Sequence, residues 1–227
     1  MTEQLILNLP VRTALGREDF FVAPSNAMAV AMLDNWRHWP AGKLLLTGPE
    51  GAGKTHLAHV WAQTTGARIL SADRLTPEQV PDLVTGPVAI EDVPRIAGDA
   101  NAQRALFHLH NLMRAEAQPL LLTARGTASH WTMSLPDLQS RLQGTQQIAL
   151  DLPDDNLLGA VLAKLFADRG LIPRADVIPY LVTRIDRSFE AAAQVVDHLD
   201  RVALREGRAL SRGFAARVLP EIAALRD

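Results

Sequence analysis

Apolar residues in this chain alternate between short continuous runs and longer stretches with helical spacing. The short runs predict buried strands at 43–47, 67–70, 88–90, 120–123 and 147–150. The helical spacing predicts helices at 24–36, 56–65, 76–83, 101–117 and 135–142. Because strands and helices alternate, we predict an α/β fold, with a parallel five-stranded sheet covered by helices on both faces.

From Asp154 onward the pattern changes to helices without strands. Helices are predicted at 156–169, 175–185, 188–206 and 212–225. The sequence therefore predicts three units. They are an extended N-terminal arm at 1–18, an α/β domain at 19–153 and a small all-α domain at 154–227.

A glycine-rich loop lies between the first predicted strand and the helix after it. It reads G-P-E-G-A-G-K-T and fits the phosphate-binding pattern G-x-x-x-x-G-K-[ST]. We expect its backbone N–H groups and Lys54 to hold the phosphates of ADP or ATP, and the Thr55 hydroxyl to hold Mg²⁺. The predicted phosphate-site residues are Gly48, Pro49, Glu50, Gly51, Ala52, Gly53, Lys54, Thr55 and the adjoining His56. A glycine-rich turn that fits the pattern by chance is the alternative.

Two acids follow the third predicted strand, about forty residues after the loop. In proteins with such a loop, the first acid orients Mg²⁺, directly or through water, and a second can polarise the attacking water. Glu91 takes the first position and Asp92 the second, the reverse of the usual order. Because the shorter Asp92 reaches less far, we expect weak intrinsic hydrolysis. The alternative is a solvated acid pair at a strand end.

Composition narrows the function classes. The 227 residues are 48% hydrophobic and 21% charged, with a formal net charge of −2 and a pI of about 6.4. That balance is typical of a globular protein and argues against a general nucleic-acid binder. The absence of cysteine excludes disulfides and thiolate metal sites. Without a signal-peptide pattern or an apolar run of about 20 residues, we expect a cytoplasmic protein with no membrane partner.

Four segments carry a family resemblance. They are Asp19–Asn26, Glu91–Asp99, Leu120–Arg125 (L-L-L-T-A-R) and Leu135–Leu142 (L-P-D-L-Q-S-R-L). With the phosphate loop, they make the chain similar to the DnaA/Hda family of AAA+ proteins, and most to its regulators without the initiator's DNA-binding domain. The resemblance implies an AAA+ fold in which the last helices form a lid. It also implies that Phe21, Val22 and Asn26 line the adenine pocket and that Thr123 lies near the γ-phosphate.

The resemblance assigns the arginine finger to Arg141. A finger supplies a guanidinium to the charge that develops on the γ-phosphate, often across a subunit boundary. The resemblance implies that Arg141 contacts ATP bound to DnaA. Asp92 and Arg141 are therefore the expected catalytic residues. Without the resemblance, Arg141 is a surface residue near a helix end. Glu190 stands where the family has its sensor 2 arginine, and a carboxylate repels a γ-phosphate. This departure is compatible with ADP as the working form, which the resemblance also implies.

The N-terminus contains a second short motif. The segment Q-L-I-L-N-L is similar to the peptide with which the family's regulators bind the β sliding clamp of DNA polymerase III. In that interpretation the clamp contacts are made by Gln4, Leu5, Leu7 and Leu9. The alternative is an arm or edge strand that packs on its own domain.

Three function classes follow. The first is a regulator that binds the clamp, promotes hydrolysis of ATP bound to DnaA and meets DNA only through the clamp. It is a weak ATPase itself, and a homo-oligomer is compatible with it. The second is an initiator or helicase loader that acts on DNA, which requires a basic DNA-binding element. The third is an ordinary P-loop enzyme, such as a small-molecule kinase, which requires a substrate pocket. The phosphate loop, the Arg141 segment and the predicted lid favour the first.

Overall fold

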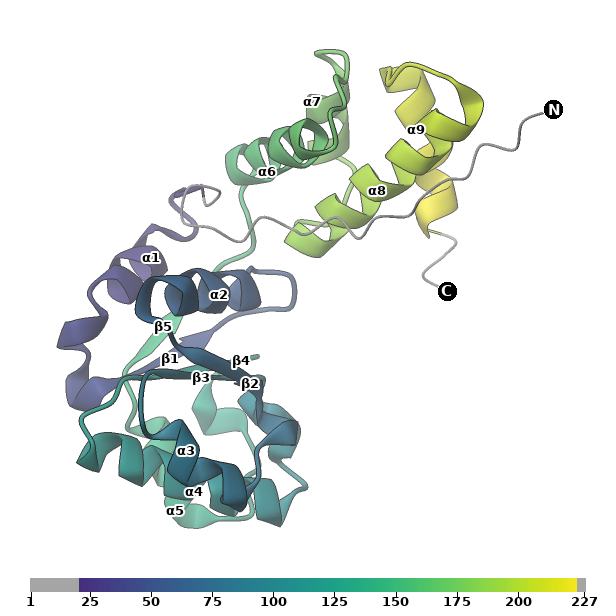
Figure 1. The fold of residues 1–227 in the computed structure, drawn as a ribbon. Helices are drawn as coiled ribbons and strands as arrows, with labels where there is room; N and C mark the ends of the chain where they lie inside the picture. Colours follow the sequence, from purple (N-terminus) through teal and green to yellow (C-terminus); the bar gives the residue numbers. More distant parts are fainter. Residues whose placement is uncertain (1–20, 224–227) are drawn as a thin grey trace.

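The computed structural model describes the backbone of residues 21–223 and the side chains of residues 21–220 (Figure 1). The predicted arm at 1–18 and its clamp motif lie outside these residues. Within them the chain forms a sheet covered by helices, followed by a group of helices.

Five parallel strands form the sheet, in the order β2-β3-β4-β1-β5. Their bounds are β1 Lys43–Thr47, β2 Arg68–Ser71, β3 Val88–Glu91, β4 Leu120–Ala124 and β5 Gln147–Ala149. The predicted α/β fold with a parallel five-stranded sheet is confirmed. Strand β1 lies between β4 and β5, and its Leu46 lies opposite Thr123 of β4. The carboxyl ends of β1 and β4 therefore meet at one edge of the sheet.

Helices cover both faces of this sheet (Figure 1). One face carries α1 Ala27–Asp34 and α2 Lys54–Thr65. The other carries α3 Val80–Leu83, α4 Ala100–Ala115 and α5 Pro136–Gln143. Short 3-10 turns span Trp36–His38, Pro40–Gly42, Ala72–Arg74, Pro77–Gln79, Val93–Ile96 and Ala128–His130.

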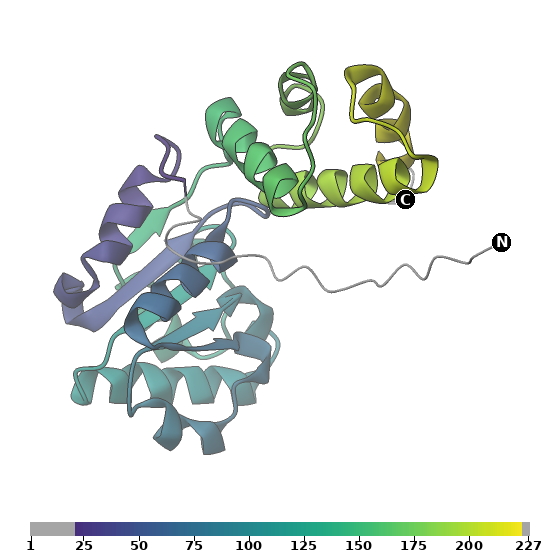
Figure 2. The same ribbon diagram turned by 45° about the horizontal axis from the view of Figure 1, so that its top comes forward.

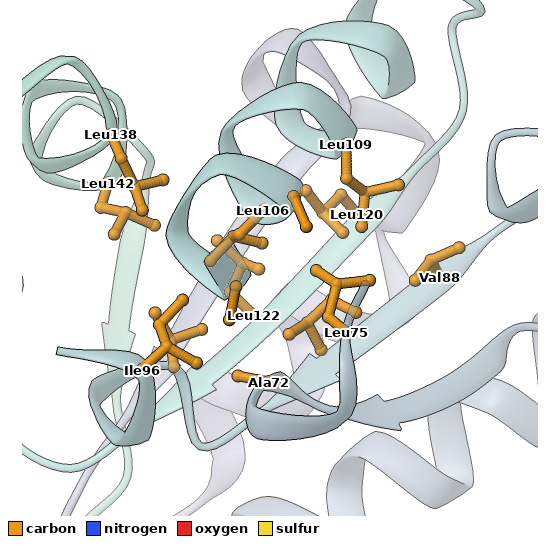
Figure 3. Packing of buried hydrophobic residues seen from close by; sticks show 14 of the residues in the cluster. Ala72, Leu75, Val88, Ile96, Leu106, Leu109, Leu120, Leu122, Leu138 and Leu142 are labelled. Carbon is orange, nitrogen blue, oxygen red and sulfur yellow. The ribbon is translucent and has the colours of Figure 1, made fainter. Parts of the chain in front are cut away.

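Side chains of β1 divide between the two faces because successive residues of a strand point in opposite directions. Leu44 and Leu46 pack with Trp61 beneath α1 and α2. Leu45 belongs to the opposite layer, where Leu122 packs against Leu106 of α4 (Figure 3). The strand is apolar throughout because both of its faces are covered.

The remaining helices have a core of their own. They are α6 Asp155–Asp168, α7 Val177–Val182, α8 Phe189–Glu206 and α9 Arg212–Ala223. Leu162 and Phe166 of α6 pack with Leu181 of α7 and Leu199 of α8. Figure 2 shows this helical group beyond α1 and α2, with α8 running past the end of α2. In residues 21–223, no helix combines the length and apolar character that a membrane span requires.

Candidate nucleotide site

The predicted phosphate loop joins β1 to α2, as the sequence pattern requires. Gly48, Gly51 and Gly53 have φ values of 150°, 74° and 94°, a region that residues with a Cβ rarely adopt. Helix α2 begins at Lys54, directly after this turn. The first N–H groups of a helix have no acceptor within the helix, so they are available to an anion in the loop.

The Lys54 side chain reaches from the start of α2 back to the loop. This side chain is buried, and its Nζ donates to the carbonyl oxygens of Gly48 at 2.9 Å and Pro49 at 2.6 Å. Burial lowers the pKa of Lys54, while the carboxylates of Asp92 and Glu50 act in the opposite direction. The predicted acid after β3 and the predicted lysine are therefore close enough to interact.

The acid pair lies where β3 ends. Glu91 is the last residue of β3, and its Oε1 is buried without a hydrogen-bond partner among residues 21–220. Asp92 has a left-handed backbone, with φ 56°, and its N–H donates to Thr123 Oγ1 at 3.2 Å. Hydroxyl and carboxylate oxygens suit Mg²⁺, and the exposed Thr55 together with Glu91 offers them. The unsatisfied Glu91 oxygen makes this donor set a good fit to a cation.

Arg125 is a site residue that the sequence analysis missed. It follows β4 directly and forms an ion pair with Glu50 of the phosphate loop. Its charge also acts on Lys54, whose pKa it helps to lower. Its position at the end of the quoted L-L-L-T-A-R segment was the available signal, because it places an arginine at the carboxyl edge of the sheet.

Helix α8 packs directly on the phosphate loop. The Phe189 N–H donates to the Gly51 carbonyl oxygen at 3.2 Å. A Cβ at Gly51 would lie 2.3 Å from the Ser188 Cβ, and a Cβ at Gly53 would lie 2.8 Å from the Phe189 ring. The Phe189 ring also stacks on His56, with centroids 6.4 Å apart. The helical group thus covers the loop, and two glycines permit the contact.

Glu190 follows Phe189 in the first turn of α8. Its side chain is exposed, and its Oε1 accepts from the Gln194 Nε2 at 3.1 Å. Arg187, the nearby basic residue, forms a 2.7 Å ion pair with Asp155 at the start of α6. Arg187, the arginine next to the sensor 2 position, is therefore already paired with an acid of the helical group.

The predicted adenine residues lie in the segment before α1. Asn26 is buried, its Oδ1 accepts from the Ala23 N–H at 2.8 Å, and its Nδ2 donates to the Phe21 carbonyl at 2.9 Å. Asn26 therefore fixes the backbone of the segment. Phe21 and Val22 are 42% and 61% exposed, so their apolar surface is free for contact.

The structure does not bring Arg141 to this loop. Arg141 is exposed near the end of α5 and lines a pocket with Lys43, His110 and Arg114. Lys43 opens β1, whereas the phosphate loop follows the other end of that strand. At ~3.3 Å per residue, the five steps from Lys43 to Gly48 separate the two places by about 16 Å.

His110, on α4, is the most perturbed base beside Arg141. Burial, with smaller contributions from Lys43, Arg141 and Arg114, lowers the pKa of His110 to about 3. Its Nε2 lies 3.5 Å from Thr145 Oγ1, and its Nδ1 is buried without a partner among residues 21–220. His110 therefore stays neutral at physiological pH.

Replacing Gly51 with Ala tests the contact between α8 and the loop. Gly66→Ala is a matched control, because Gly66 has φ 75° and an open space at its Cβ position. Both variants should lose about 1–2 kcal/mol of stability from left-handed strain. Only Gly51→Ala should displace Ser188 and speed hydrogen exchange of the Phe189 N–H. Equal protection of that amide in the two variants would contradict the proposed contact.

The depressed pKa of His110 predicts a pH dependence of stability. The unfolded chain takes up a proton at His110 as the pH falls below about 6.5, whereas the folded chain does so only near pH 3. From this group alone, the free energy of unfolding should fall by about 1.4 kcal/mol per pH unit between pH 6 and 4. His110→Gln should remove that slope in urea denaturation, and exposed His108→Gln should keep it. Identical slopes for the two variants would refute the assignment.

No family model matches the chain. Among solved structures, it is similar to domain III of the Thermotoga maritima replication initiation protein DnaA, with 17% identity and a TM-score of 0.81 over 94% of this chain and 99% of that one. AMPPCP-bound DnaA from Aquifex aeolicus is 20% identical, with a TM-score of 0.64 over 84% of this chain and 65% of that one.

A second kind of protein shares the arrangement. The Thermotoga maritima RuvB Holliday junction branch migration motor is 16% identical, with a TM-score of 0.72 over 92% of this chain and 72% of that one. At these identities the likeness is one of fold. The chain has the AAA+ α/β fold that DnaA and RuvB share.

Proposed function

We propose that this chain is a nucleotide-binding AAA+ regulator of chromosomal replication initiation, which promotes hydrolysis of ATP bound to DnaA. One observation carries the proposal. A complete phosphate loop lies at the carboxyl end of β1, and an exposed arginine, Arg141, lies at the other end of the same strand. The chain can therefore hold one nucleotide and offer a guanidinium to another.

The nucleotide is held by the loop and the helix after it. The backbone N–H groups at the start of α2 and the Lys54 ammonium bind the phosphates. Phe21 and Val22, on the segment fixed by Asn26, provide apolar contact for the base. Thr55 and Glu91 hold Mg²⁺, which when bound neutralises charge on the phosphate oxygens. Thr123 accepts a hydrogen bond from the Asp92 N–H, and this bond positions Asp92 at the carboxyl edge of the sheet.

Intrinsic hydrolysis is weak in this proposal. Asp92 polarises the attacking water, but its short side chain extends from a strained left-handed position. Glu190 is an acid where a γ-phosphate would need a cation, and Arg187 is held by Asp155. These features support ADP, rather than ATP, as the nucleotide that the chain retains. Residues 154–227 act as its lid, because Ser188 and Phe189 close over the loop.

Arg141 acts in trans. A distance of about 16 Å along β1 keeps it from its own phosphate loop, while its exposure makes it accessible to a partner. Arginine suits the role because its fork stays charged and can bind two phosphate oxygens. The fold shared with DnaA supports an association in which the two chains meet as neighbouring AAA+ units. DnaA bound to AMPPCP is among the similar structures, which supports ATP as the partner's nucleotide.

The sliding clamp is the second proposed partner. Gln4, Leu5, Leu7 and Leu9 form the docking peptide, which would bring the chain to DNA only through the clamp. Support for this step comes from the sequence motif alone, because these residues lie outside the part that the structure describes.

Arg141→Ala tests the trans role. DnaA-bound ATP should be hydrolysed up to about 10³-fold more slowly with this variant than with wild type, in the presence of clamp loaded on DNA. Arg104→Ala, which removes an exposed arginine from α4, should stimulate as wild type does. Full stimulation by Arg141→Ala would rule out the finger.

The docking peptide is tested by a double substitution, Gln4→Ala with Leu5→Ala. It should abolish clamp pull-down and leave ADP affinity unchanged, because the peptide is separate from the phosphate loop in sequence. Asn8→Ala lies in the same segment but outside the motif positions, and should keep clamp binding. Clamp pull-down that survives the double substitution would end this part of the proposal.

A further inference from the structure

A second polar pocket lies at the amino edge of the sheet, away from the phosphate loop. It has a volume of about 160 Å³, which equals roughly five waters of liquid volume. Its polar side chains come from β1, α4 and α5. They are Lys43, His110, Asn111, Arg114, Ser140 and Arg141, and Thr145 adds a hydroxyl from the turn after α5. None of the residues that line the pocket is acidic, so its charge is uniformly positive.

Lys43 is the least expected member of this set. Its side chain is only 3% exposed, and it has no hydrogen-bond or ion-pair partner within residues 21–220. Lysine is rarely buried this far without a partner, because desolvation of an ammonium is costly. Burial, followed by the charges of Arg114 and Arg141, lowers the pKa of Lys43 to about 8. At neutral pH the side chain remains an ammonium that lacks a counter-ion.

The two arginines leave this charge uncompensated. Arg114 and Arg141 are exposed, and neither forms an ion pair among the described residues. Asn111 and Ser140 add neutral side chains that can donate hydrogen bonds at the same pocket. The backbone beside it is strained as well, because Ala41 has φ 52°. Like charges gathered around one hollow destabilise the fold, and an anion in the hollow would offset that cost.

We propose that this pocket binds a phosphate-class oxyanion. Lys43, Arg114 and Arg141 neutralise its charge, and Asn111 and Ser140 donate to its oxygens. Guanidinium and ammonium groups together suit a tetrahedral dianion, because both make charge-assisted hydrogen bonds to its oxygens. The anion is either free or the terminal phosphate of a nucleotide. Binding is a property of this chain alone and does not depend on the proposed action on DnaA.

Sulfate is the probe, because it stays a dianion throughout the neutral range. The protein is full-length Lys54→Ala, in which the phosphate loop has lost its cation, and titrations use sodium sulfate against chloride at constant ionic strength. Calorimetry should show one saturable sulfate site per chain. Adding Arg114→Ala should weaken it at least about tenfold, whereas adding Arg104→Ala on the same helix should leave it unchanged.

Lys43→Met separates a binding role from a structural one. Replacing this unpaired cation, which belongs to an almost fully buried residue, with an apolar side chain of similar length should keep or raise the unfolding temperature. The same variant should lose sulfate affinity. Loss of stability together with unchanged sulfate affinity would overturn the proposal, as would a sulfate site that survives Arg114→Ala.

The two sources of the anion are distinguished by competition in the Lys54→Ala protein. If AMPPCP displaces sulfate, and if AMPPCP binding is lost on adding Arg114→Ala, the ligand is a nucleotide's terminal phosphate. If inorganic phosphate displaces sulfate and AMPPCP does not, the ligand is a free anion. If Lys54→Ala bound nucleotide at the loop as tightly as the wild-type chain does, the proposed function would be contradicted, while the result at this pocket would stand.

Discussion

Close approach of Ser188 and Phe189, at the start of α8, to the loop backbone at Gly51 and Gly53 is the constraint on which the rest of the structure depends. The loop must turn with positive φ values, and α8 must reach it within hydrogen-bonding distance. Any Cβ at either glycine would meet Ser188 or Phe189 at less than 3.0 Å. The loop that faces the phosphates and the surface that receives the helical group are therefore the same few residues. A nucleotide bound at this loop would therefore lie beside both the sheet and the helical group.

Strand β1 gives the molecule two ends with different charge environments. At its carboxyl end, Lys54 lies among the carboxylates of Glu50 and Asp92. At its amino end, Lys43 lies among cations alone. The sheet is apolar on both faces, so little water or counter-charge lies between the ends. A single rigid strand thus fixes the distance between a nucleotide held by this chain and whatever anion meets Arg141.

The sequence predicted much of the fold because strands covered on both faces are continuous apolar runs. The run at 43–47 matches β1 residue for residue. The predicted helix at 76–83 instead splits into a 3-10 turn and the four-residue α3, because Pro81 supplies no N–H for a longer helix. The predicted helix at 175–185 is also shorter, ending at Val182 as α7.

Side-chain contacts between distant segments were harder to predict. The loop motif named Lys54 and Thr55, but no local pattern joins Glu50 to Arg125 or places Phe189 over Gly53. The Glu50–Arg125 contact depends on the pairing of β1 with β4, and the Phe189–Gly53 contact depends on how the helical group packs on the loop. Lys43 could be placed in a strand from its apolar neighbours, yet its burial beside Arg114 and Arg141 depends on where α4 and α5 end.

The most direct measurement is a calorimetric titration of Mg²⁺–ADP into the wild-type chain, Lys54→Ala and Arg141→Ala. If one end of β1 holds the chain's own nucleotide and the other serves a different anion, wild type and Arg141→Ala should bind one ADP with equal affinity, and Lys54→Ala should lose it. Absence of binding to wild type, or an equal loss in both variants, would contradict that division.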